Sequence, residues 1–125
     1  MIFAKRVFLV AGIYGLIVLV PQYFLESRTG RDFPPPITHP EYYYGFIGVA
    51  VAWQIVFLLI SRDPARYRPI MLVAIVEKAS FGLPAMALYA GGRLSGQMLA
   101  AGIIDLVLGA LFAMAYTRTS PARSE

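Results

Sequence analysis

The chain of 125 residues contains no cysteine and only one histidine, His39. The absence of cysteine excludes disulfide bonds, thiol catalysis, iron–sulfur ligation and covalent attachment of a c-type haem. With a single histidine, a haem held between two histidines of this chain is excluded as well. We therefore expect no cofactor, and no metal-ligand set is assigned.

Charge is also scarce, since only 14% of the residues are Asp, Glu, Lys or Arg and the mean hydropathy is +0.65. The apolar residues gather in four long segments, at residues 7–25, 42–60, 69–89 and 98–116. A bilayer core about 30 Å thick is crossed by about 20 helical residues. The sequence therefore predicts an all-α, integral membrane four-helix bundle. It forms a single transmembrane domain over residues 1–125, because no room remains for a separate soluble domain.

Two features bear on how the first segment and the loops are placed. Residues 7–25 follow Lys5 and Arg6 but end without an A-x-A-like cleavage site, which favours an uncleaved helix over a signal peptide. The basic residues at the chain ends and in the middle loop all fall on one side of the predicted bundle: Lys5, Arg6, Arg62, Arg66, Arg68, Arg118 and Arg123. Because cytoplasmic loops carry the excess of Lys and Arg, both termini are predicted to be cytoplasmic. The excess of basic residues behind the net charge of +4 is thus explained by the orientation of the chain in the membrane, and no nucleic-acid partner is expected.

The loop at residues 26–41 is rich in proline between positions 34 and 40. Proline forbids regular helix there and favours a stiff, extended path, which predicts an ordered cap over the outer mouth of the bundle. His39, with Glu41 and Asp32, could hold a metal ion or a polar head group at that mouth. One histidine with carboxylates at irregular spacing is a weak signal for such a site, and an ordinary loop histidine is favoured.

Four polar side chains lie inside the apolar segments: Gln54, Glu77, Lys78 and Asp105. At 1.5 Å per helical residue they lie about 10–18 Å from the inner ends of their helices, in one layer. Placing an ionisable group at such depth in a membrane costs free energy, so these residues are expected to have a structural or functional role. We therefore predict a buried cluster of three charges with an amide partner.

Helical periodicity places small residues around these groups. Asp105 shares a stripe with Gly109, and Lys78 shares a face with Gly82. The small faces of the four predicted helices are Ala11, Gly12 and Gly15; Gly45, Gly48 and Ala52; Ala74, Gly82 and Ala85; Ala101, Gly109 and Ala113. Small residues let neighbouring helices approach closely in a membrane, so these faces are expected to be packed against protein.

The cluster allows several interpretations. It can be a structural ion pair that fixes helix register, or a site that handles a proton or a ligand, or Lys78 can extend its ammonium to an interface. Because two carboxylates share one lysine, a negative charge is left over, and one carboxylate should bind a proton. In a ligand site Gln54, Glu77, Lys78 and Asp105 would be the binding residues. Lys78 would then donate to the ligand, and the carboxylates would accept or carry a proton.

The strings EYYYGF at residues 41–46, DPARYRP at 63–69 and the pair Glu77–Lys78 resemble those of small bacterial inner-membrane proteins. The overall plan is similar to the broad DoxX-like group of four-helix proteins. The resemblance implies a multi-pass subunit of the bacterial inner membrane, and some members of the group are associated with quinone-linked electron transfer. It carries over no catalytic residue.

Three functions remain open. The first is an accessory protein that binds a lipid-like or quinone-like head group in the polar layer. The second is a proton-coupled transporter of small molecules that acts as an oligomer. The third is a membrane enzyme that uses Glu77 and Asp105 as an acid–base pair. The expected partners are the lipid bilayer and a second copy of the chain or a larger membrane complex.

Overall fold

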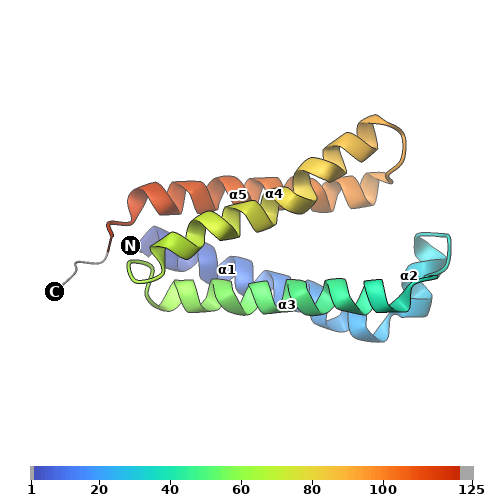
Figure 1. Ribbon diagram of the computed structural model, residues 1–125, viewed down its shortest axis with the longest axis horizontal. Helices are drawn as coiled ribbons and strands as arrows, with labels where there is room; N and C mark the ends of the chain where they lie inside the picture. The colour runs from blue at the N-terminus through green and yellow to red at the C-terminus, as the bar shows by residue number, and fades with distance from the viewer. Residues whose placement is uncertain (1, 122–125) are drawn as a thin grey trace.

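The computed structural model describes residues 2–121, and within that range the chain is helical without strands. Figure 1 shows the elements in chain order: α1 (Ile2–Leu19), the 3-10 helix η1 (Val20–Phe24), α2 (Glu26–Asp32), α3 (Pro40–Arg62), α4 (Arg68–Ala90) and α5 (Gly96–Arg118). The predicted all-α architecture is confirmed. Arg123, counted above among the basic residues, lies outside the described residues.

The four predicted apolar helices correspond to α1 with η1, α3, α4 and α5, and all four are long and apolar enough to cross a membrane. Each begins or ends a few residues outside the predicted boundary. The largest difference is at α1, which begins at Ile2 and includes Lys5 and Arg6. Both basic side chains are exposed, so the helix continues past the apolar segment at no cost in buried charge.

The long helices pack as two pairs. α1 lies along α3, and α4 lies along α5, and these two contacts are the most extensive in the molecule. Between the pairs α1 touches α5 to a lesser extent, and α3 touches α4 still less although they follow each other in the chain. We call the end with Ile2, the 63–67 loop and Arg118 the terminal end, and the end with α2 and the 91–95 turn the loop end. The two pairs lie close together at the terminal end and further apart at the loop end (Figure 1).

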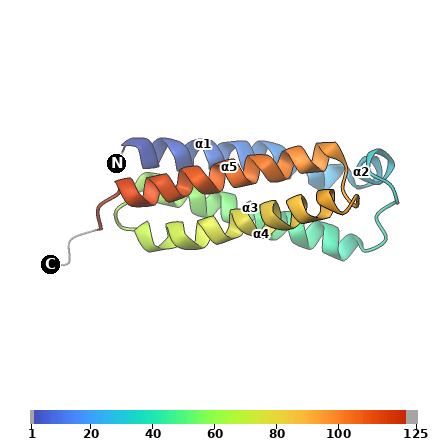
Figure 2. The same ribbon diagram turned by 90° about the horizontal axis from the view of Figure 1, so that it is seen from above.

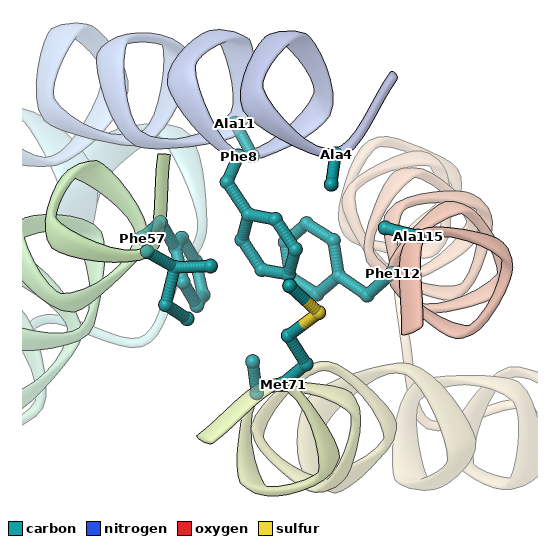
Figure 3. Packing of buried hydrophobic residues seen from close by; sticks show 9 residues of the cluster. Ala4, Phe8, Ala11, Phe57, Met71, Phe112 and Ala115 are labelled. Atoms are coloured by element: carbon teal, nitrogen blue, oxygen red, sulfur yellow. The ribbon is translucent and has the colours of Figure 1, made fainter. Parts of the chain in front are cut away.

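All four long helices contribute to one apolar core near the terminal end (Figure 3). Its centre is three buried phenylalanines from three helices. The ring of Phe8 stacks on Phe112 at 4.2 Å between centroids, and Phe57 meets Phe112 edge-on at 4.9 Å. Met71 of α4 fills the remaining side of the aromatic group. Offset and edge-on pairs are the favoured geometries for aromatic rings, so this core fixes the helices at one end.

The ends of α4 and α5 are joined at the terminal end by Arg68. Its Nε donates hydrogen bonds to the backbone carbonyls of Thr119, at 2.6 Å, and Tyr116, at 3.2 Å. Its guanidinium also lies over the Tyr116 ring, 3.7 Å from the centroid. The last carbonyls of a helix have no partner within the helix, so Arg68 of one helix caps the end of another.

The loop end differs from the sequence prediction in one respect. Residues 26–41 were expected to form an extended loop, but Glu26–Asp32 is the short helix α2. The prolines begin only at Pro34, so they leave the first half of the segment free to form helical hydrogen bonds. The proline-rich half folds back over α2, where Gly30 lies against the backbone of Pro36. Figure 2 shows this segment across the loop end of the bundle.

Candidate functional site

Lys78 is the centre of the polar cluster. It lies on the buried face of α4, and its side chain is only 6% exposed. Its Nζ is 3.6 Å from Oε2 of Glu77 and 3.6 Å from Oδ1 of Asp105 on α5. Both carboxylates are mostly buried, with side chains 19% and 22% exposed. The structure therefore brings three of the four predicted site residues into one ion-paired group.

Close packing of α4 against α5 positions this group. A methyl group added at Gly102 would lie 2.6 Å from Cβ of Ala85, and one at Gly82 would lie 2.6 Å from the side chain of Leu106. Such distances are shorter than real side chains allow, so the two glycines set the spacing of the helices. Two turns after Gly102 along α5, Gly109 lies against Cβ of Lys78. Small residues at these points place Asp105 within reach of the ammonium of Lys78.

On the other side of the cluster Lys78 faces the aromatic core. Its Nζ lies 5.1 Å from the centroid of the Phe57 ring on α3, within the range of a cation–π interaction. The ammonium is thus bounded by two carboxylates and one aromatic ring. Both of its ion pairs and its ring contact are therefore made with side chains of this chain.

Gln54, the fourth predicted site residue, faces a different helix. Its Nε2 donates to the carbonyl of Ala50 at 2.9 Å, and its side chain fills the space left by Gly15 on α1. It is 2% exposed, and its Oε1 is buried without a hydrogen-bond partner among the described residues. Gln54 therefore belongs to the contact between α1 and α3, and among residues 2–121 its side chain forms a hydrogen bond only within its own helix.

A groove between α3 and α4 leads to the cluster. It has a volume of about 270 Å³ and is lined by four residues of each helix: Phe46, Val49, Ala50 and Trp53; Val73, Val76, Glu77 and Ser80. Most of its apolar walls are exposed, since Val49 and Val76 are each 64% accessible. Glu77 is the one charged residue in the lining. The groove thus connects the open surface of the helices with a carboxylate of the cluster.

Glu77 is incompletely satisfied in this position. Its Oε2 is buried and accepts no hydrogen bond from residues 2–121, and its nearest partner is the ammonium of Lys78 at 3.6 Å. The hydroxyl of Ser80, also in the groove, donates to the backbone carbonyl of Glu77 and not to its side chain. A buried polar atom without a hydrogen bond is costly, so the long contact with Lys78 leaves Glu77 less well satisfied than most buried polar groups.

Only some of the small residues predicted to pack against protein are buried. Ala74, Gly82 and Ala85 are buried on α4, and Gly109 is buried on α5, as predicted. In contrast, Gly45 and Ala52 of α3 and Ala113 of α5 are exposed, so the prediction that these positions pack against protein is wrong for the single chain. The physical reason is that α3 turns its Gln54 face to α1 and meets α4 over few residues, which opens the groove. Sequence analysis missed Phe46 and Trp53 as groove residues because their roles depend on this separation.

The loop end holds no metal site. His39 Nδ1 lies 3.2 Å from Oε1 of Glu41, but Asp32 is paired instead with Arg28 at 3.5 Å. Within residues 2–121 there is no group of three His, Asp or Glu side chains that could hold a metal ion. His39 stacks on Tyr42 with 4.7 Å between ring centroids, which is an ordinary contact for a loop histidine.

The chain was also compared with known proteins. No family model, no curated protein and no solved structure matches it. The site is therefore interpreted from its own geometry.

Proposed function

We propose that this chain is a multi-pass protein of the bacterial inner membrane, similar in plan to the DoxX-like group. It binds the head group of a lipid-like or quinone-like molecule in the groove between α3 and α4. Four helices long and apolar enough to span a bilayer support the first part of this proposal. Large apolar side chains are exposed along all four of them, which suits a hydrocarbon environment and would be unfavourable in water.

The proposed orientation places the terminal end in the cytoplasm. Arg62, Arg66 and Arg118 lie at this end, and all three are exposed. Single cysteines at Ser27 and Ser120 provide a test, because both positions are exposed and lie at opposite ends of the bundle. In intact cells a membrane-impermeant thiol reagent should label the Ser27→Cys variant, while the Ser120→Cys variant should be labelled only after lysis. Labelling of both from the same side would contradict this topology.

The observation that carries the binding proposal is the position of Glu77. It is the one charged residue in the lining of an apolar groove between α3 and α4, and its ion pair with Lys78, at 3.6 Å, is longer than a hydrogen bond. Binding sites for small molecules are mostly apolar with a few convergent polar groups, and this groove has that composition. Ionisable residues within a membrane are candidate functional sites by default.

The three charged residues have different roles in this proposal. Glu77 contacts the ligand, because it lines the groove. Lys78 is nearly inaccessible and holds both carboxylates in place. Asp105 balances Lys78 from the side of α5, so that the ammonium stays paired when Glu77 turns toward a ligand. This division replaces the expectation that Lys78 itself donates to the ligand.

Extraction of lipids from the purified protein tests the proposal. The unmodified protein, the Glu77→Gln variant and the control variant Asp32→Asn are purified in the same mild detergent, and their bound lipids are compared by mass spectrometry. Asp32 is an exposed carboxylate of α2 and does not line the groove. We expect one class of molecule to accompany the unmodified protein and the control and to be depleted in Glu77→Gln. Identical lipid profiles for all three proteins would contradict the proposal.

A further inference from the structure

With both carboxylates ionised, the cluster next to the groove carries more negative than positive charge. Two carboxylates, Glu77 and Asp105, share the single ammonium of Lys78. Lys78 is buried and does not line the groove, whereas Glu77 is part of the lining. A molecule in the groove can therefore contact the carboxylate of Glu77 directly, but it cannot contact the ammonium of Lys78.

The wall opposite Glu77 is aromatic and uncharged. α3 contributes Phe46 and Trp53 together with two small or β-branched apolar residues. Trp53 is half-buried and packs by its inner side against the core, so its ring is held in place. The face of an aromatic ring attracts a cation, and tryptophan does so best. A fixed indole ring and a carboxylate on opposite walls of one groove form a suitable pair for a positively charged group.

We infer that the groove takes a lipophilic organic cation, an amphiphile with an ammonium or similar head group, and not an anionic or neutral one. This inference rests on the proposed function and specifies the ligand class of the same site. The cation pairs with Glu77 in the groove lining and takes the place of the proton that the surplus carboxylate would otherwise bind. An anionic head group would be repelled by that surplus, and a carbonyl head group would leave it uncompensated.

The size of the groove fits the head of such a molecule. Sites that enclose a whole drug-sized ligand have volumes of about 300–1,000 Å³. The groove, at about 270 Å³, is slightly smaller than this range and is open along its apolar walls. The head group would lie between Glu77 and Trp53, and an apolar tail would extend past Val49 and Val76 into the surrounding lipid.

Trp53 also provides the measurement, because it is the only tryptophan in the chain and lines the groove. The purified protein in a neutral detergent is titrated with phenyltrimethylammonium, and binding is followed by the fluorescence of Trp53. The matched probe is tert-butylbenzene, which has nearly the same shape and no charge. We expect the cation to bind at least about tenfold more tightly than the neutral probe. Equal affinities, or no binding of the cation, would overturn the inference without any variant.

Two variants then test the contact with Glu77. Glu77→Gln and Asp105→Asn each remove one negative charge from the cluster, and each leaves Lys78 with one carboxylate, so both are expected to fold. Only Glu77 lines the groove, however. Glu77→Gln should weaken binding of the cation at least about tenfold, and Asp105→Asn should weaken it less. Equal losses in the two variants would show that the cation does not contact Glu77 and would overturn the inference.

Failure of the inference about a cationic ligand can be distinguished from failure of the proposed lipid-binding function. If a neutral or anionic lipid is extracted with the protein and is lost in Glu77→Gln, the groove is a binding site but its ligand is not a cation. The lipid-binding function would then stand, and the inference about charge would fail.

Discussion

At the terminal end Phe8, Phe57 and Phe112 come from three helices and share one core, whereas toward the loop end the helices separate into two pairs. The difference arises from the side chains that each end offers. Large apolar rings fill the space between four helices at the terminal end. Further along, glycines draw α4 against α5 and α1 against α3, and little remains to join α3 to α4.

In the proposed function the two regions have separate roles. In lipid the hydrophobic effect does not drive helices together, so packing and polar contacts must do so. The shared aromatic core holds the two pairs together at one end, where Arg68 also joins α4 to α5. The looser contact between α3 and α4 leaves a groove beside a charged group. A protein that binds molecules from the membrane needs both a stable part and an accessible part.

The largest effect is expected at the point where the two regions meet, at Lys78. Lys78→Met removes the only positive charge between Glu77 and Asp105, and breaking a buried pair in this way costs about 3–5 kcal/mol of unfolding free energy. Adding Asp105→Leu removes one of the stranded carboxylates and should recover much of the loss. Unfolding in a denaturing detergent, followed by circular dichroism, measures both variants.

The double variant also separates a structural from a functional role of the cluster. If it is as stable as the unmodified protein but has lost its bound lipid, the cluster serves binding. If it is stable and retains the lipid, the charges only fix helix register, and the binding proposal loses its main support.

A second prediction compares the same truncation in the two regions. Phe112→Ala at the terminal end leaves a cavity between Phe8 and Phe57, and we expect a loss of about 3 kcal/mol, at the low end of the range for such changes. Phe46→Ala removes an equal ring from the groove wall, where the side chain is 59% exposed. It should change stability by less than about 1 kcal/mol, because little packing is lost. Similar losses for both variants would show that the ends do not differ in packing.

A third prediction concerns the contact between α4 and α5. Gly102→Ala would place a methyl group against Ala85, which has no flexible end that could move aside. Overpacking of this kind should cost about 2 kcal/mol and should shift Asp105 away from Lys78. Gly96→Ala on the same helix is the control, because a side chain there meets nothing within 4 Å. If Gly102→Ala leaves stability unchanged, the spacing of the two helices is not set by this glycine.

Much of the fold was predictable from the sequence. Apolar length alone located all four long helices, and helical periodicity identified the buried face of α4 through Ala74, Lys78 and Gly82. The short helix α2 could not be found in this way, because its exposed, polar sequence carries no apolar periodicity. The separation of the helices into two pairs could not be predicted from the sequence either. It depends on which small faces meet, and Gly45 of α3 is as small as Gly82 of α4 but meets no neighbour.

The candidate site was predictable to a similar degree. Equal depth and suitable faces predicted that Lys78 would meet both carboxylates, and the two 3.6 Å distances agree with this. The partner of Gln54 was not predictable, because equal depth does not specify which neighbour a side chain faces. Only the packing of Gln54 against Gly15 shows that it serves the contact between α1 and α3.

The smallest effect is expected at the extreme terminal end, where Arg68 caps α5. Arg68→Ala removes the donor for the carbonyls of Thr119 and Tyr116 and the ring contact with Tyr116. The loss should be about 1 kcal/mol, since a hydrogen bond contributes about that much net and water can replace part of it. The effect should be local, with faster hydrogen exchange of the amides in the last turn of α5. Arg66→Ala is the matched control, because Arg66 is exposed and its guanidinium lies over the ring of Tyr67, its neighbour in the chain. If both variants exchange alike, Arg68 does not stabilise the end of α5, and the helix packing alone joins α4 to α5 at the terminal end.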